Sequence, residues 1–269
     1  MFVKWAKRKH RGAFDGVNVS GVHYNGDRSS PENGQRSFKA NELEKLFACK
    51  EMKEHCANGG QVYKFWLAVI ALYTGMRVNE ICQLNLNTDI VNGDGVWYFL
   101  ISSKTESAEG VTKSVKSGEA RQVPVNSKLI ELGFFDYIDE LNKCGHKRMF
   151  PSDAIHNNSV SGNTARNFRR FIEDVGLRDE TSNKRIVGMH AFRKTIITKA
   201  YRDGFLGDLL PIVGHESDKR DEGGFKIPDV TKVYIDDEEL EIPLSVKKET
   251  IEKIVFDIEF YKPVKPVFR

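Results

Sequence analysis

One almost uninterrupted apolar segment, from Tyr63 to Tyr73, constrains the fold more than any other part of the chain. A helix with apolar side chains on every face is stable only when other elements cover it on all sides. Gly75 is well placed to end this helix in a left-handed conformation, which glycine adopts readily. A second helix is expected to start near Arg77. The sequence therefore predicts a buried helix followed by a tight turn that carries an arginine.

The rest of the chain predicts a mainly helical α+β domain with one small sheet. Further helices are expected at about 40–57, 127–143, 161–175, 190–203, 207–213 and 245–258. Three short strands are expected at 89–91, 96–101 and 121–125, with a hairpin turn at Asn92-Gly-Asp-Gly95. In the last helix, Val246, Ile251, Ile254 and Val255 should lie on one side. These segregated elements predict a three-stranded antiparallel sheet rather than a doubly wound one.

Composition places the protein among soluble globular proteins. Of its 269 residues, 40% are hydrophobic and 29% are charged. No apolar run approaches the roughly 20 residues that cross a bilayer, and the amino terminus has no apolar signal core. We therefore expect a cytoplasmic protein with no membrane contact. The four cysteines have no close paired spacing, so neither a zinc site nor a disulfide framework is predicted.

The domain organisation also follows from composition. Residues 1–36 are polar and rich in glycine, serine and asparagine, which is typical of a linker or a disordered arm. Residues 37–269 are expected to form the single folded domain. Within it, residues 161–202 contain ten Lys and Arg against four acids, and residues 234–259 contain nine acids against three lysines. A basic middle beside an acidic tail is compatible with a surface that binds a polyanion.

Several residues could together hold and cleave a phosphodiester. Arg77 and Arg193 could bind both non-bridging oxygens of a phosphate, because a guanidinium is a planar, permanently charged fork of donors. Glu80, one turn after Arg77, could orient it. His190 lies three residues before Arg193, so on a helix the two share a face, and a histidine can take up or release a proton near neutral pH.

The remaining candidates follow in the second half of the chain and in one long loop. His215 follows Gly214 where a short helix should end, and it could donate to a phosphate oxygen. Tyr234 could attack phosphorus once neighbouring cations and a base activate its hydroxyl. Lys104, after the second strand, could protonate a leaving oxygen, with Lys113 and Lys116 of the same loop as rivals. Tyr201 and Tyr261 are the alternative nucleophiles.

The order arginine, loop lysine, HxxR, histidine and tyrosine resembles the catalytic domain of the tyrosine site-specific recombinases, or phage integrases. The segments Leu72–Leu84 and Met149–Pro151 also read like integrase sequence. The resemblance implies a DNA breaking-rejoining fold. It also implies DNA cleavage and rejoining through a 3′-phosphotyrosyl intermediate, without metal or other cofactor. Arg77, Arg193 and His215 would bind the scissile phosphate, His190 would act as base for Tyr234, and Lys104 would be the general acid.

The same resemblance implies partners and leaves alternatives. Double-stranded DNA is the expected substrate, with Arg166, Arg169 and Arg170 of helix 161–175 as candidate DNA contacts. Self-association into a tetrameric synapse and accessory DNA-bending or directionality proteins are implied as well. The insert between His215 and Tyr234 is unusually long, and the core-binding domain that usually precedes the catalytic domain is not visible, as in a truncated fragment. The alternatives are a type IB topoisomerase-like nicking-closing enzyme and a non-catalytic DNA-binding relative.

Overall fold

The computed structural model describes residues 35–57, 59–108, 110–115, 118–151, 160–178, 186, 188–214 and 242–264. Its helices are α2 (Ala40–Ala48), α3 (Lys50–Cys56), α4 (Tyr63–Thr74), α5 (Val78–Cys82), α6 (Ser127–Glu131), α7 (Phe134–Lys143), α8 (Gly162–Asp174), α9 (His190–Arg202), α10 (Leu206–Val213) and α12 (Leu244–Glu252). Its strands are β1 (Ile90–Gly93), β2 (Val96–Ile101) and β3 (Arg121–Pro124). The predicted mainly helical α+β class is therefore confirmed.

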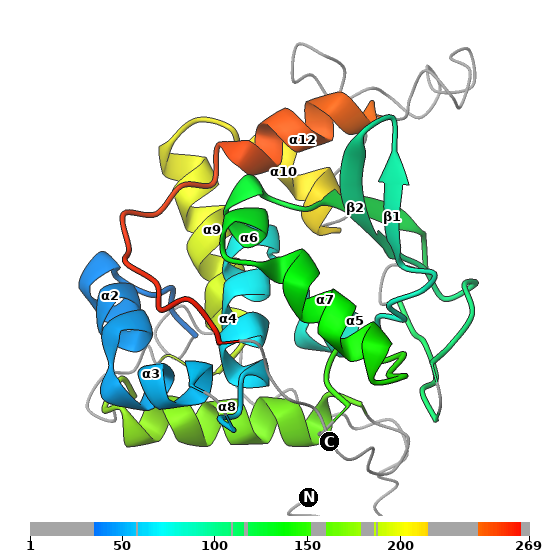
Figure 1. Cartoon of the computed structure of the whole chain (residues 1–269). Coiled ribbons are helices and arrows are strands. Elements are labelled where there is room, and N and C mark those ends of the chain that lie inside the picture. Colours follow the sequence, from blue (N-terminus) through cyan, green and yellow to red (C-terminus); the bar gives the residue numbers. More distant parts are fainter. Residues whose placement is uncertain are drawn as a thin grey trace, which may run out of the picture.

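The burial predicted for the apolar helix is confirmed. Every residue of α4 except Lys64 is buried, and α4 packs against α3, α5, α6 and α9. Figure 1 shows α4 running through the middle of the domain, with the sheet to one side and α8 along one end. Gly75 ends the helix with a left-handed φ of 64°, and its N–H donates to the carbonyl of Ala71. The chain that leaves α4 is thus turned sharply inside the core.

The small sheet has the predicted antiparallel pairing. Its strand order is β1-β2-β3, with Ile90 opposite Phe99 and Phe99 opposite Val123. The hairpin turn between β1 and β2 places Asp94 and Gly95 at positive φ, as the predicted turn requires. Only the first strand begins one residue later than expected, at Ile90. Its neighbour Asp89 is instead part of a buried ion pair, described below.

Three predicted helices differ from those observed. Helix 40–57 is broken at Cys49, which is extended (ψ 155°) and whose Sγ accepts from the N–H of Met52 to cap a new helix. Helix 127–143 is broken at Gly133, where φ is 92°. Helix 245–258 stops at Glu252, because the side chain of Asn126 donates to the carbonyls of Ile251 and Ile254. Side chains of Cys49 and Asn126 therefore set two of these boundaries, and a left-handed glycine sets the third.

The one-sided apolar stripe predicted for the last helix is only partly present. Ile251 and Ile254 are buried in the core, but Val246 and Val255 are exposed. The helix α12 packs within its own chain, against α10, β2 and β3. Beyond it, the chain runs back along the domain, as Figure 1 shows in red, until the N–H of Val264 donates to the carbonyl of Cys56.

At the amino-terminal end of the described residues, a short segment packs on α9. The backbone N–H of Phe38 donates to Oγ1 of Thr195, and the Phe38 ring lies 4.8 Å from that of Phe192. Lys194 Nζ donates to the carbonyl of Gln35. Residues 1–34 lie outside the described residues, so the predicted boundary between an arm and the domain stays a prediction.

Candidate active site

Arg77 is positioned by the turn that ends α4 and by the start of α5. It occupies the N-cap position of α5 in an extended conformation, and its backbone N–H donates to Oε2 of Glu80 over 2.8 Å. Its guanidinium donates through Nη1 to Oε1 of the same carboxylate, also over 2.8 Å. The Arg77 side chain remains 25% exposed, whereas that of Glu80 is only 2% exposed. Glu80 is therefore a buried partner of Arg77, and the orienting role predicted for it stays a prediction.

Arg193 approaches the same turn from α9. Its side chain is buried because α9 packs between α4 and α10, and its Nη1 donates to the carbonyl of Gly75 (2.8 Å) and to that of Val213. Burial, followed by repulsion from Arg77, lowers the pKa of Arg193 to about 10. The guanidinium is thus still protonated at neutral pH. Within the described residues, its Nη2 is buried and has no hydrogen-bond partner.

The two arginines that are far apart in sequence converge on the end of α10. Arg77 Nη2 donates to the carbonyl of Gly214 over 3.1 Å, and Arg193 donates to the preceding carbonyl, that of Val213. Because both side chains engage consecutive carbonyls, they lie at one place in the molecule. A helix C-terminus carries partial negative charge, which favours cations there. A bound phosphate would find two guanidinium groups at this position.

A third arginine, Arg121, joins this cluster and was missed in the sequence. It is the first residue of β3, and its Nη2 donates to Oε2 of Glu80 over 2.6 Å. Its Nε donates to the carbonyl of Ile212 over 3.0 Å. Burial alone would raise the pKa of Glu80, but the charge and hydrogen bonds of Arg121 and Arg77 outweigh it and hold that pKa below its ordinary value. The only sequence signal was a charged residue that starts a predicted strand.

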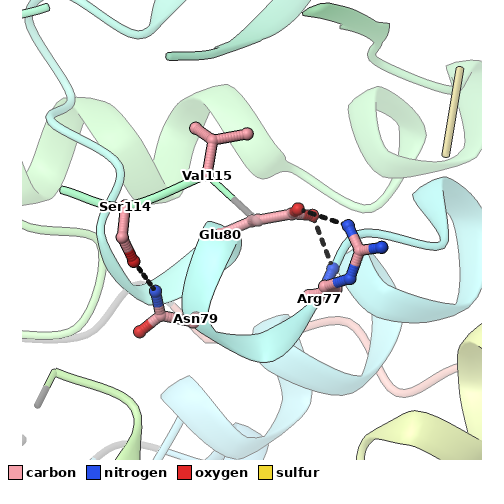
Figure 2. A pocket seen from close by; sticks show the side chains of 5 residues that line it. All are labelled: Arg77, Asn79, Glu80, Ser114 and Val115. Carbon is pink, nitrogen blue, oxygen red and sulfur yellow. Dashed lines mark hydrogen bonds and ion pairs between the residues drawn. The ribbon is translucent and has the colours of Figure 1, made fainter. Parts of the chain in front are cut away.

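A pocket of about 290 Å³ opens beside Arg77 and Glu80. Asn79 lines it from α5, and Ser114 and Val115 line it from the β2–β3 connection. Asn79 Nδ2 donates to Oγ of Ser114 over 3.2 Å, so the long connection is fastened to α5 (Figure 2). The loop that contains the three candidate lysines therefore forms one wall of the site.

Of the two candidate lysines that the structure describes, Lys113 has its ammonium group buried in an ion pair. Lys113 Nζ lies 2.8 and 2.6 Å from the two carboxylate oxygens of Asp89 and 2.7 Å from Oγ1 of Thr105. The side chains of Lys113 and Asp89 are 1% and 2% exposed. Lys113 therefore fastens the connection to the start of the sheet. Lys104 is exposed, and Lys116 lies outside the described residues.

Of the other predicted catalytic residues, the structure describes His190. His190 is the first residue of α9 and is exposed, one helical turn from Arg193. The predicted end of the helix before His215 is confirmed, because α10 stops at Val213 and Gly214 is left-handed with φ 66°. His215 itself and Tyr234 lie outside the described residues, so their roles stay predictions.

The candidate DNA contacts and the alternative nucleophiles lie on the outside of the domain. Arg166, Arg169 and Arg170 are exposed on α8, although Arg169 pairs with Glu173 over 3.3 Å. Tyr201 is exposed near the far end of α9, eleven residues or about 16 Å from His190 at 1.5 Å per residue. Tyr261 donates its hydroxyl to the carbonyl of Ala48. Tyr201 is therefore far from His190 along α9, and the hydroxyl of Tyr261 is engaged at the end of α2.

Two features are absent from the described part of the chain. It contains no group of three or more His, Cys, Asp and Glu side chains arranged to hold a metal ion. None of its helices is both long and apolar enough to span a membrane.

The fold and the arginine cluster define a class: an α+β protein in which three arginines, from the start of α5, from α9 and from the start of β3, meet at the end of α10. The sequence model of the Phage integrase family matches residues 36–220 of this chain. The chain therefore belongs to the phage integrase family, as the resemblance in its sequence indicated. No curated protein matches the chain.

The chain is similar in part to solved structures of recombinases. The crystal structure of XerH site-specific recombinase bound to difH substrate, a pre-cleavage complex, aligns at 20% identity and a TM-score of 0.43, over 67% of this chain and 47% of that one. The post-cleavage complex with palindromic difH aligns at 20% identity and 0.44, over 74% and 51%. XerA recombinase aligns at 18% identity and 0.42, over 81% and 64%. The chain thus spans between 47% and 64% of these proteins.

Proposed function

We propose that this protein is a site-specific DNA recombinase that cleaves and rejoins strands through a 3′-phosphotyrosyl intermediate. The observation that carries the proposal is the convergence of Arg77 and Arg193 on the carbonyls of Val213 and Gly214. These residues come from three separate parts of the chain and meet immediately before His215. Two guanidinium groups at one point can bind both non-bridging oxygens of a phosphodiester and the charge that grows on them in the transition state.

In the proposed reaction, the Tyr234 hydroxyl attacks phosphorus and gives its proton to His190. The bond between phosphorus and the 5′-oxygen breaks, and the departing oxygen takes a proton from Lys104. The tyrosine is then joined to the 3′-phosphate, and the reverse attack by a 5′-hydroxyl restores the DNA and frees the tyrosine. No energy source is consumed, because one phosphodiester replaces another at each step.

The proposed substrate is double-stranded DNA. The exposed arginines of α8 supply phosphate or base contacts, and binding is expected to weaken steeply with salt because such contacts release counterions. Strand exchange needs two DNA sites, so we infer a tetramer on DNA, assisted by accessory DNA-bending or directionality proteins. A reaction on such DNA places the protein in the cytoplasm.

The test is covalent adduct formation on a nicked suicide substrate, from which the cleaved fragment diffuses away. The wild-type chain should form an adduct, and Tyr234→Phe should form none while retaining DNA binding. Tyr201→Phe is the matched control and should behave like the wild type, because Tyr201 lies about 16 Å along α9 from His190. An adduct that survives Tyr234→Phe would refute the assignment.

The lysine that protonates the leaving oxygen can be tested separately. A substrate with sulfur in place of the bridging 5′-oxygen needs no general acid, because a thiol has a pKa of about 8.5 and leaves as the thiolate. Lys104→Ala should cleave this substrate at nearly the wild-type rate but the ordinary substrate slowly. If instead the Lys116→Ala variant cleaves the sulfur-containing substrate at nearly the wild-type rate and the ordinary substrate slowly, Lys116 is the general acid.

The same assays separate the alternatives. A type IB topoisomerase-like enzyme forms the adduct and relaxes supercoiled DNA, but it yields no recombinant product from two sites. A non-catalytic DNA-binding relative forms no adduct at any concentration that saturates the DNA. Synaptic products that join two DNA sites are expected only from a recombinase.

A further inference from the structure

Three consecutive carbonyls at the end of α10 each accept from a different arginine. Arg121 Nε binds the carbonyl of Ile212, Arg193 Nη1 that of Val213, and Arg77 Nη2 that of Gly214. Arg77 and Arg193 are the proposed phosphate ligands. Arg121 has no part in the reaction described so far, although its side chain is only 10% exposed and lies in the same cluster.

Arg121 shares one carboxylate with Arg77. Glu80 gives Oε2 to Nη2 of Arg121 over 2.6 Å and Oε1 to Nη1 of Arg77 over 2.8 Å. Because Oε2 accepts from Arg121 and from the backbone N–H of Arg77, the Arg77 guanidinium is held by Oε1 alone. The rest of the Arg77 fork then remains available, and one of its nitrogens reaches Gly214. Without Arg121, the acceptor position that it leaves on Oε2 could also bind the Arg77 guanidinium and draw its fork away from the phosphate position.

Arg121 also contacts the backbone just before His215. A side chain at Gly214 would place its Cβ 2.8 Å from Cζ and 3.0 Å from Nη1 of Arg121, so only glycine lets the guanidinium lie this close. Gly214 is moreover left-handed, with φ 66°, which also favours glycine. Within the described residues, Nη1 of Arg121 is buried without a hydrogen-bond partner. A buried donor left unpaired is destabilising, and a role in the site would account for its retention.

We propose that Arg121 is a positioning residue for strand cleavage, which fixes Glu80, and through it Arg77, against the end of α10. The inference rests on the proposed recombinase function. Arg121 acts through Arg77 and through the backbone that leads to His215, and it transfers no proton. Misplacing a catalytic group by about 1 Å can cost about 100-fold in rate, so loss of Arg121 is expected to slow cleavage by about 10- to 100-fold.

The test compares two DNA substrates. In the first, the scissile linkage is an ordinary phosphodiester; in the second, a methyl group replaces one non-bridging oxygen, so the linkage has no charge. Arginines that act on that charge matter less on the second substrate. Arg77→Ala should therefore show a large loss of adduct formation on the phosphodiester and a much smaller one on the methylphosphonate. Arg121→Met should show the same pattern, and the double variant should be no slower than Arg77→Ala alone.

Two further variants separate positioning from folding. Arg36→Met is the matched control, because Arg36 also pairs with a carboxylate, that of Glu42, through hydrogen bonds of 2.6 and 2.7 Å. It should leave the rates on both substrates unchanged. Arg121→Lys keeps the charge and perturbs the fold least, yet one ammonium group cannot reproduce the fork between Glu80 and Ile212. It should show a smaller loss than Arg121→Met, again confined to the phosphodiester.

The possible outcomes are distinct. Equal losses on the two substrates, matched by a fall in unfolding temperature, would make Arg121 merely structural and overturn the inference. No loss in either Arg121 variant would overturn it as well. A wild-type chain that forms no adduct on either substrate would instead overturn the proposed function, and the inference with it.

Discussion

Replacing Lys113 with methionine would leave the carboxylate of Asp89 buried without its cation. The pair is 2.6 Å apart at its closest, and both side chains are almost fully buried. Asp89 would keep only the donors of its own turn, the N–H of Asn85 and the hydroxyl of Thr88. Breaking a buried pair by removing one partner typically destabilises a protein by about 3–5 kcal/mol. We expect Lys113→Met to lose about that much free energy of unfolding.

The assay is urea unfolding followed by circular dichroism. Lys104→Met is the matched control, because it makes the same substitution in the same connection at an exposed lysine, and it should change stability by less than about 0.5 kcal/mol. Adding Asp89→Asn to Lys113→Met should recover about 1–2 kcal/mol, because it removes the unpaired charge.

If Lys113→Met lost no more free energy of unfolding than Lys104→Met, the buried ion pair with Asp89 would not stabilise the fold as predicted. It would mean that Lys113 is free in solution and could again compete with Lys104 as the general acid. A double variant less stable than Lys113→Met would also contradict the account, because the buried charge would then not be the cause of the loss.

Three further predictions concern the framework around the site. Gly75→Ala should lose about 2–5 kcal/mol of unfolding free energy, because its Cβ would lie 2.3 Å from the nearest side-chain carbon at a φ of +64°. Gly95→Ala, at a φ of +81° with open space around it, should lose about 1 kcal/mol. Equal losses of the two variants in urea unfolding would contradict this. Asn126→Ala should lose about 1–3 kcal/mol in the same assay, because Asn126 caps one helix and binds the end of another. Burial, then repulsion from Lys64, lowers the pKa of His55 from 6.5 to about 4. The unfolded chain therefore binds a proton at this histidine more readily, and the free energy of unfolding should fall as pH drops from about 6.5 to 4. The expected loss is about 1–2 kcal/mol after allowance for the partly exposed ring. His55→Phe should remove that part of the pH dependence, and an unchanged slope would contradict it.

The local parts of the site could be predicted from the sequence. The apolar helix, its end at Gly75 and the start of the next helix at Arg77 all depend on residues close together in the chain. The same is true of the hairpin at 92–95 and of the helix end before His215. Periodicity, glycine and capping preferences act over a few residues, so they are visible in a sequence.

The parts that were missed depend on contacts between distant residues. Arg121 gains its place from Glu80 and Ile212, 41 and 91 positions away. Lys113 looks like any loop lysine until Asp89, 24 positions earlier, is placed beside it. The end of α12 depends on Asn126, 125 positions away. Such partners are set by tertiary packing, which no local pattern records.

In the proposed function, a tyrosine of this chain becomes joined to the 3′ end of a cleaved DNA strand at a site formed by Arg77 and Arg193. The most direct measurement is mass spectrometry of peptides from the wild-type chain trapped on a suicide substrate, after nuclease digestion. We predict that the peptide containing Tyr234 carries a nucleotide linked through its 3′-phosphate. A nucleotide on any other residue, a linkage through a 5′-phosphate, or no modified peptide at saturating DNA would contradict the account.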